Sequence, residues 1–262
     1  MLTDGISMQT LTVDEFDEPI LLNLIDTPGW VADDNGEDAA RVCTNLVAFL
    51  EEQMDSRVIE ELKVRRDKYA PNLIVHACLY FMDPLHNEYR ATDIPIIKEL
   101  GTRVNLIPVV GKSDLITLTQ KLQFQLEFIN SMKRHADQVS LFDLPGDSVD
   151  ANESMTGDVP LTMSRDTRTF DKHPDFLGRC YPWGRIDCMD PDQSDFAVLR
   201  TMLLESHRDM LRQHTVSSIY EEYRCRQLQS KKRDDLLQRC GSLKLRNAFN
   251  SSALELNGHR QV

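Results

Sequence analysis

The chain has 262 residues, of which 41% are apolar and 27% charged, so it can bury a core as one large domain or two small ones. Its net charge of −12 argues against a protein that binds nucleic acid or an anionic membrane over its whole surface, because such proteins neutralise phosphates with lysine and arginine. The six cysteines form no Cys-x-x-Cys pair and the N-terminus carries no secretory pattern, which together predict a cytosolic protein with reduced thiols.

The first third of the chain predicts a hairpin followed by a long helix. Residues 8–16 alternate apolar and polar side chains, and residues 20–25 form an apolar run beyond a charged break, which favours two antiparallel strands. From Ala39 to Leu62 apolar residues recur every three or four positions. This spacing predicts an amphipathic helix with one buried face.

The middle of the chain predicts a parallel sheet. Residues 73–81 (LIVHACLYF) and 104–110 (VNLIPVV) are short apolar runs typical of strands that helices cover on both faces. Between them, a helical face is predicted to end at Gly101. Strand, helix and strand in this order predict a right-handed crossover in an open parallel sheet.

The second half is less regular. A helix is predicted over residues 115–132, whereas residues 144–174 are rich in turn-forming side chains and predict a loop or insert. A short strand is predicted at residues 185–188 and one helix over residues 195–211. From residue 220 the chain becomes a polar tail.

The stretch VVGKSDL allows two interpretations. Gly111-Lys112-Ser113 could end a phosphate-binding P-loop, but a P-loop needs a glycine five residues earlier, and that position is Leu106. An aspartate that follows a strand can instead accept two hydrogen bonds from guanine, while the lysine stem lies along the ring. We therefore assign Lys112 and Asp114 to base recognition; taken alone, the motif would equally suit an ordinary polar turn with a capping aspartate.

A second motif, Asp26-Thr27-Pro28-Gly29, follows the strand predicted at residues 20–25. In a D-x-x-G motif the aspartate can hold Mg²⁺ through water, and the glycine N–H can meet a γ-phosphate. In a GTPase a D-x-x-G motif is followed by a strand, a helix and a second strand, and then by a Lys-x-Asp motif. The motifs of this chain come in the same order.

A third stretch, GRCYPWG at residues 178–184, is far more specific than the other two. With it, most of the chain resembles the G domain of the septin family, from the second strand of that domain to its last helix. The matching segments are LIDTPGW (24–30), CLYFMDP (78–84), VNLIPVVGKSDLIT (104–117), GRCYPWG (178–184), DFAVLRTML (195–203) and YEEYR (220–224).

The resemblance implies an α/β fold: a three-layer G domain of the P-loop-NTPase type with a mostly parallel sheet. Residues 1–224 would form this domain, truncated at its N-terminus and carrying the loop-rich insert at 144–174 and a septin-specific C-terminal element. Residues 225–262 would form a short polar tail. The family's upstream strand, P-loop and first switch have no counterpart before Met1.

The resemblance also implies roles for single residues. Lys112 and Asp114 would read the base and Arg179 would pack beside it, with a surface ion pair as the alternative for the arginine. Asp26 and Gly29 would form the Mg²⁺ and γ-phosphate switch. Trp183 would lie at a nucleotide-side subunit interface, with a place in the core as its alternative.

Three positions depart from the family pattern. His86 is displaced by one from the place of an interface histidine, where Asn87 stands, so we interpret it as a loop residue. Arg165 stands nearest the place of a guanine-contacting glycine, which weakens the base site. Trp30 begins a stretch that replaces the second glycine of the switch segment, which should stiffen that segment.

The function that the resemblance implies is a GTP/GDP- and Mg²⁺-binding cytoskeletal scaffold. It would assemble with other septin subunits into hetero-oligomers or filaments at the cell cortex or division site, without nucleic acid. Without a P-loop, nucleotide binding should be impaired and GTP hydrolysis inactive. The alternatives are a partner-binding module that needs no nucleotide, and an active GTPase. The basic cluster at residues 231–233 could meet a membrane surface but suits a solvated helix end better.

Overall fold

The computed structural model describes residues 5–14, 19–30, 36–65, 67, 72–83, 93–135, 161–162, 177–182 and 184–232. The chain divides into two compact units, Met1–Ile219 and Tyr220–Val262. No helix within the described ranges combines the length and the apolar character that a bilayer span needs.

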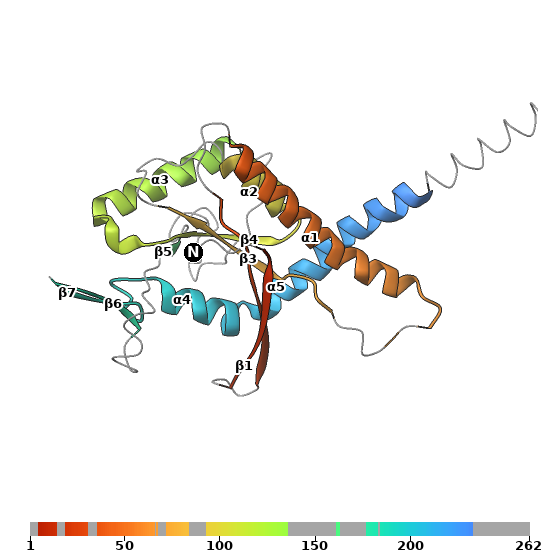
Figure 1. Cartoon of the computed structure of the whole chain (residues 1–262), viewed down its shortest axis with the longest axis horizontal. Coiled ribbons are helices and arrows are strands. Elements are labelled where there is room, and N and C mark those ends of the chain that lie inside the picture. The colour runs from red at the N-terminus through yellow and green to blue at the C-terminus, as the bar shows by residue number, and fades with distance from the viewer. Residues whose placement is uncertain are drawn as a thin grey trace, which may run out of the picture. The chain divides into compact units, whose positions relative to one another are not determined.

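The predicted N-terminal hairpin is present. Strands β1 (Ser7–Val13) and β2 (Ile20–Asp26) pair antiparallel, with Ser7 opposite Asp26 and Val13 opposite Ile20. Within the part of the chain that the structure describes, this hairpin is a separate two-stranded sheet (Figure 1). Leu21 and Leu24 of β2 are 68% and 48% exposed, and because they lie three positions apart in the strand they point to opposite faces, so both faces of the hairpin are partly open to solvent.

The predicted parallel sheet is confirmed and gains a third strand. Strand β3 (Ala77–Met82) lies parallel to β4 (Asn105–Val110), and β4 lies parallel to the short β5 (Leu161–Thr162). Helix α2 (Asp93–Gly101) connects β3 to β4. The strand expected from residue 73 begins only at Ala77, because an apolar run does not show where hydrogen-bonded pairing starts.

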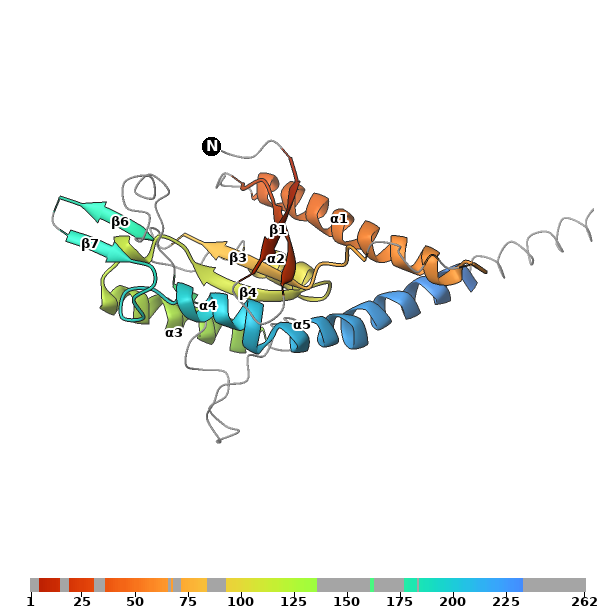
Figure 2. The same ribbon diagram turned by 90° about the horizontal axis from the view of Figure 1, so that it is seen from below.

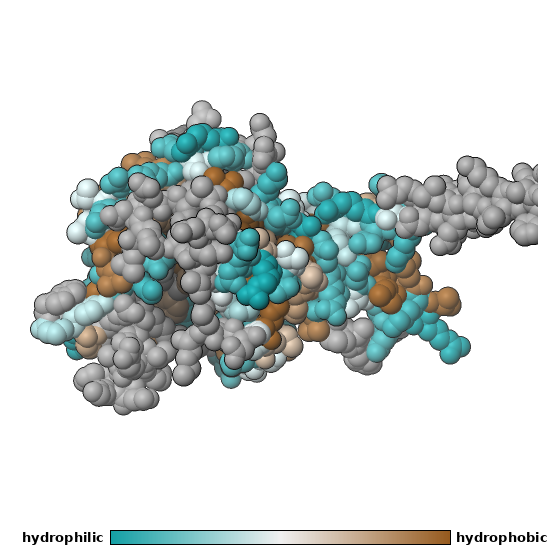
Figure 3. Space-filling view, turned by 45° about the horizontal axis from the view of Figure 1, so that its top comes forward, coloured by the Kyte–Doolittle hydropathy of each residue, from teal (hydrophilic) through white to brown (hydrophobic). Residues whose placement is uncertain are grey.

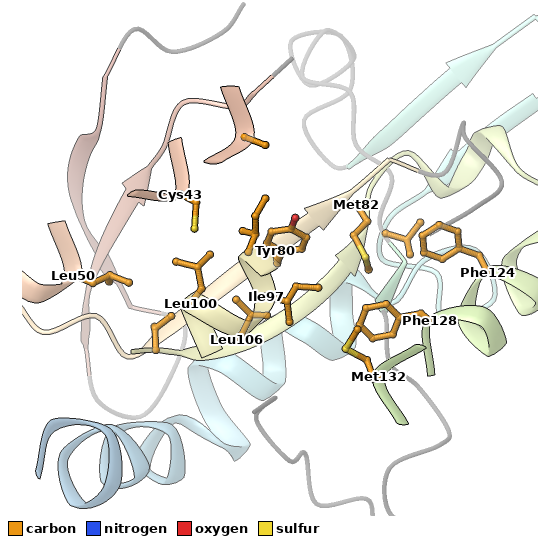
Figure 4. Packing of buried hydrophobic residues seen from close by; sticks show 14 residues of the cluster. Cys43, Leu50, Tyr80, Met82, Ile97, Leu100, Leu106, Phe124, Phe128 and Met132 are labelled. Atoms are coloured by element: carbon orange, nitrogen blue, oxygen red, sulfur yellow. The ribbon is translucent and has the colours of Figure 1, made fainter. Parts of the chain in front are cut away.

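Every residue of β4 is buried, which explains why its sequence is continuously apolar. On one face, its side chains join a cluster with residues from α1 (Glu37–Leu62), α2 and α3 (Leu118–Arg134). Figure 4 shows this cluster, in which Leu106 of β4 lies beside Ile97 and Leu100, and Phe124, Phe128 and Met132 of α3 lie toward its other end.

The opposite face of the sheet packs on a second cluster. Ile107 and Val109 of β4 contact Leu199 of α4 (Phe196–Thr201) and Met202, which follows it. Figure 1 shows α1, α2 and α3 on one side of β3 and β4, with α4 on the other. Helices therefore cover both faces of the parallel sheet, as the three-layer α/β prediction requires.

The helix predicted over residues 195–211 is present as helical winding, but it is not one continuous α-helix. The segment divides into α4, a π-helical turn (Met202–Ser206), α5 (Arg208–His214) and a second π-helical turn (Thr215–Tyr220). At the first break the N–H of His207 donates to the Met202 carbonyl, an i→i−5 bond of 3.0 Å. Periodicity in the sequence cannot distinguish this wider winding from an α-helix.

The ends of the two long helices also differ from prediction. Leu62, predicted on the buried face of α1, is the last residue of the helix and is 58% exposed. Helix α3 begins three residues later than expected, because Thr117 and Gln120 form a capping box that sets its first turn. A 3₁₀ turn (Ser113–Leu115) precedes this cap.

A second hairpin lies between β5 and α4 in the chain. Strands β6 (Gly178–Tyr181) and β7 (Gly184–Asp187) pair antiparallel, with Arg179 opposite Ile186 (Figure 2). The second compact unit is helical as far as residue 232. On the face drawn in Figure 3, apolar residues form separate patches among hydrophilic ones.

Candidate functional site

The candidate site lies where β3 and β4 end. The N–H of Gly111, just after β4, donates a 2.9 Å hydrogen bond to the carbonyl of Met82, the last residue of β3. This bond extends the hydrogen-bond ladder between β3 and β4 by one residue. It brings Asp83 beside the predicted base-reading turn, Lys112–Asp114. The carboxyl ends of parallel strands are where α/β sheets bind ligands.

The backbone at this position does not serve as a phosphate loop. The N–H of Gly111 is already bonded to Met82, and a methyl group added at Gly111 would make only ordinary contacts, at 3.7 Å from the Met82 carbonyl oxygen and 3.8 Å from Phe81. The glycine is therefore not there to admit a phosphate, which supports the guanine-reading interpretation of the motif.

Lys112 has a left-handed backbone, with φ of 52° and ψ of 41°. Within the described residues it is the one non-glycine residue with positive φ, a conformation that costs about 1–2 kcal/mol for a side-chain-bearing residue. Its ammonium lies 3.8 Å from Oδ2 of Asp83, and both side chains are about half exposed. An exposed pair of this kind holds its partners weakly, so the lysine can turn to a ligand.

Asp114 lies in the 3₁₀ turn and is bonded to a distant residue. The hydroxyl of Tyr181, at the end of β6, donates a hydrogen bond to Oδ2 of Asp114, although 67 positions separate the two residues. The second hairpin is thus joined to the base-reading turn. Tyr181 belongs to GRCYPWG, the most specific of the three sequence motifs, but that motif by itself predicts no role for the tyrosine.

Ser113 gives a test of whether the turn fits a ligand. Its hydroxyl oxygen is buried and, among the described residues, has no hydrogen-bond partner. Buried hydroxyls are normally paired, so an orphan between Lys112 and Asp114 indicates that the turn lacks a polar partner here. The side chains of the turn also fit guanine: the Asp114 carboxylate can accept from the base N–H groups, and the Lys112 stem can lie along the ring.

The D-x-x-G motif lies elsewhere in the unit. Asp26 is the last residue of β2 and pairs with Ser7; Asp26 and Gly29 are both exposed. The structure therefore unites Lys112 and Asp114 in one turn after β4, whereas Asp26 ends a strand that, among the described residues, belongs to the separate two-stranded sheet.

Trp30 attaches the D-x-x-G segment to the core. Its ring centroid is 5.8 Å from that of Tyr80 on β3, at an interplanar angle of 37°, and the side chain packs against the first core cluster. Tilted aromatic pairs add about 0.5–1.5 kcal/mol to their burial energy. This contact joins the end of the D-x-x-G segment to β3.

The remaining predicted residues cannot be placed. Trp183, His86, Asn87 and Arg165 lie outside the described residues, and for Arg179 only the backbone is described. No group of three or more histidine, cysteine or acidic side chains that could hold a metal occurs in the portions described.

The sheet, its covering helices and the Lys-x-Asp turn define an α/β domain of the G-domain class. A family model described as Septin matches residues 2–235. A solved structure described as a septin GTPase domain from Chlamydomonas reinhardtii has a TM-score of 0.64 at 20% identity and covers 84% of this chain and 80% of that one. This likeness supports the fold.

Named relatives agree with the family model. Cell division control protein 11 of Encephalitozoon cuniculi is 30% identical over 84% of this chain and 81% of its own length. Cell division control protein 10 of Saccharomyces cerevisiae is 29% identical over 86% and 70%, and Septin-2 of Rattus norvegicus is 26% identical over 86% and 63%. The chain belongs to the septin family.

Proposed function

We propose that this chain is a septin-type scaffold subunit that recognises guanine nucleotides through the turn after β4. The observation that carries the proposal is the placement of Lys112 and Asp114 in one turn at the carboxyl end of a parallel strand, in a chain of the septin family. GTP or GDP is the proposed ligand, because a carboxylate pairs with the two N–H groups on the base edge of guanine and repels the N1 lone pair of adenine.

Nucleotide affinity is proposed to be low. The 262 residues contain no Gly-x-x-x-x-Gly-Lys-Ser/Thr sequence, so the backbone ring and lysine that cradle phosphates in P-loop proteins have no counterpart among them. Arg179 would pack beside the base. When Mg²⁺ is bound with the nucleotide, Asp26 would hold it through water, Gly29 would contact the γ-phosphate, and the ion would neutralise phosphate charge.

The scaffold role is proposed from family membership. Association with other septin subunits, as a hetero-oligomer or filament at the cell cortex or division site, would use the face around Trp183. A large aromatic side chain is a common anchor of such interfaces. Replacing Trp183 by alanine is expected to weaken association with a partner septin more than it lowers the melting temperature; equal losses would instead place Trp183 in the core.

The second candidate is a partner-binding module that needs no nucleotide. The observation that favours it is the bond from Tyr181 to Asp114, since the carboxylate already has a donor within the chain. Calorimetric titration of the 262-residue chain with GDP and Mg²⁺ separates the two. We expect binding weaker than micromolar that disappears in Asp114→Ala, with no GTP turnover. Binding unaffected by this substitution would remove the guanine-reading role, and no binding at all would favour the second candidate.

A further inference from the structure

A side-chain hydrogen bond joins the second hairpin to the base-reading turn. Tyr181 is the last residue of β6, opposite Gly184 in the hairpin register, and its hydroxyl donates to Oδ2 of Asp114. Both side chains are half-buried. Figure 2 shows the hairpin near one end of α3, the helix that follows the turn.

The chemistry of this bond suits an ionised carboxylate. A phenol that donates to a carboxylate oxygen makes a charge-assisted hydrogen bond, which favours the charged form. An ionised carboxylate has about four lone-pair sites on its two oxygens, so it can accept the Tyr181 hydroxyl and other donors together. Tyr181 and a guanine base can therefore bind Asp114 at the same time.

The bond also restricts the carboxylate. A side chain that rotates freely must be ordered when its ligand binds, which costs conformational entropy, and a carboxylate already held by another group avoids part of this cost. We propose that Tyr181 is a positioning residue: it orients Asp114 for the guanine edge and tethers the β6–β7 hairpin to the base-reading turn. This inference rests on the proposed guanine recognition.

The tether implies an energetic coupling in both directions. If the oriented carboxylate binds guanine better, then bound guanine must stabilise the Tyr181–Asp114 bond by the same factor, and with it the position of the hairpin. Binding of guanine should therefore make the β6–β7 hairpin more ordered, and an ordered hairpin should strengthen guanine binding. If Tyr181 instead blocked the base, guanine binding would break the Tyr181–Asp114 bond and loosen the hairpin, and loss of the tyrosine hydroxyl would strengthen guanine binding.

Cys180 provides a reporter beside the tether, because it is exposed and adjacent to Tyr181. Cys43 and Cys188 are buried, and burial raises the pKa of the Cys78 thiol to about 11, so these thiols should react slowly. Replacing Cys225, which is exposed, and Cys240, which lies outside the described residues, by serine leaves Cys180 as the reactive thiol.

The first experiment measures the rate at which a thiol reagent labels Cys180 in the absence of nucleotide. Tyr181→Phe and Asp114→Ala should each raise the rate severalfold, and the double variant should raise it no further, because both remove the same bond. Tyr80→Phe is the matched control: it removes a buried tyrosine hydroxyl from β3 and should leave the rate unchanged. Additive single effects, or no effect, would overturn the tether.

The second experiment titrates GDP and inosine diphosphate, whose base lacks the 2-amino group that a well-oriented carboxylate would bind. Tyr181→Phe should weaken GDP binding by about three- to tenfold and reduce the preference for GDP over inosine diphosphate. GDP should slow Cys180 labelling in the wild type and have less effect in Tyr181→Phe. A purely structural role would leave the preference unchanged.

The outcomes separate this inference from the proposed function. GDP binding that depends on Asp114 but is unchanged or tightened in Tyr181→Phe would overturn the positioning role and leave guanine recognition standing. If the wild type and every variant bind neither nucleotide at millimolar concentration, the guanine function itself fails, and the positioning role fails with it even where the labelling shows the tether.

Discussion

The hydroxyl of Tyr80 donates a 2.7 Å hydrogen bond to Oδ1 of Asp93, and both side chains are buried. The bond joins β3 to the first turn of α2, and the same tyrosine ring contacts Trp30. Tyr80 thus connects the D-x-x-G segment with the helix that crosses from β3 to β4.

We expect Tyr80→Phe to lower the free energy of unfolding by about 1.5–3 kcal/mol, because it removes a donor from a buried acidic side chain while keeping the ring contact. Urea denaturation measures the change. Asp93→Asn keeps an acceptor for the Tyr80 hydroxyl, so its free energy of unfolding should fall by less. A loss below about 0.5 kcal/mol in Tyr80→Phe would mean that this bond does not contribute to the core.

Asn105, the first residue of β4, joins the start of the sheet to α5 and the turn after it. Its amide nitrogen lies 2.6 Å from the His76 carbonyl, 3.0 Å from the Leu211 carbonyl and 2.9 Å from Oγ1 of Thr215, and its oxygen lies 2.6 Å from Nδ1 of His214. Only 2% of the residue is exposed, so these polar groups have little access to water.

Asn105→Ala should therefore reduce the free energy of unfolding by about 2–4 kcal/mol, since several buried groups lose a partner together. Asn23→Ala is the matched control: its bond to Thr10 is exposed, and the loss should stay within about 0.5 kcal/mol. Thermal and urea unfolding of both variants measure the difference. Similar losses in the two would contradict the role of Asn105 as a buried junction.

The stability of the fold should depend on the protonation of His76. Burial lowers the pKa of its imidazole below the usual 6.5, and the charges of Arg212 and Arg57 lower it further. The unfolded chain then binds the proton more readily than the folded chain. The contribution of His76 to stability should be constant above about pH 7 and fall as the pH drops below 6.5. Below the pKa of the folded state this contribution should stop changing.

Urea midpoints measured between pH 8 and pH 5 on the wild type and His76→Gln test this dependence. The variant should lose less stability than the wild type over the acidic half of the range. The difference between the two curves isolates His76 from the other six histidines. Parallel curves would show that its pKa is the same in the folded and unfolded states.

The left-handed backbone of Lys112 predicts a conflict between stability and binding. Lys112→Gly should raise the free energy of unfolding by about 0.5–1 kcal/mol, because glycine adopts positive φ without steric strain but loses more entropy on folding. It should at the same time weaken GDP binding, since the ammonium and its stem are lost. Thermal unfolding and calorimetry measure the two effects on one preparation.

Gly111→Ala is the adjacent control, because the added methyl group meets only ordinary contacts and φ at this position is not positive. It should change stability by no more than about 0.5 kcal/mol and leave any nucleotide binding intact. A large loss of binding in Gly111→Ala would revive the phosphate-loop interpretation of this stretch.

Local pattern in the sequence was enough for much of the fold and for part of the site. The apolar run at residues 104–110 identified β4 because a strand covered on both faces has no polar positions, and every residue of that strand is buried. The identity of Leu106 was enough to reject a phosphate loop, since no side chain fits that position of the loop. Lys112 and Asp114 lie in one short segment, so their proximity needed no tertiary information.

Only the tertiary structure decided which distant groups meet. Tyr181 reaches Asp114 across 67 positions, and Asn105 reaches Thr215 across 110. A hydrogen bond of this kind depends on where the fold places the hairpin and α5 relative to the turn after β4 and to the start of β4, and residue spacing along the chain carries no record of that placement. The π-helical turns after α4 and α5 were missed for a related reason: their winding depends on local bonding such as that of Thr215 to the Leu211 carbonyl, whereas the apolar period stays close to that of an α-helix.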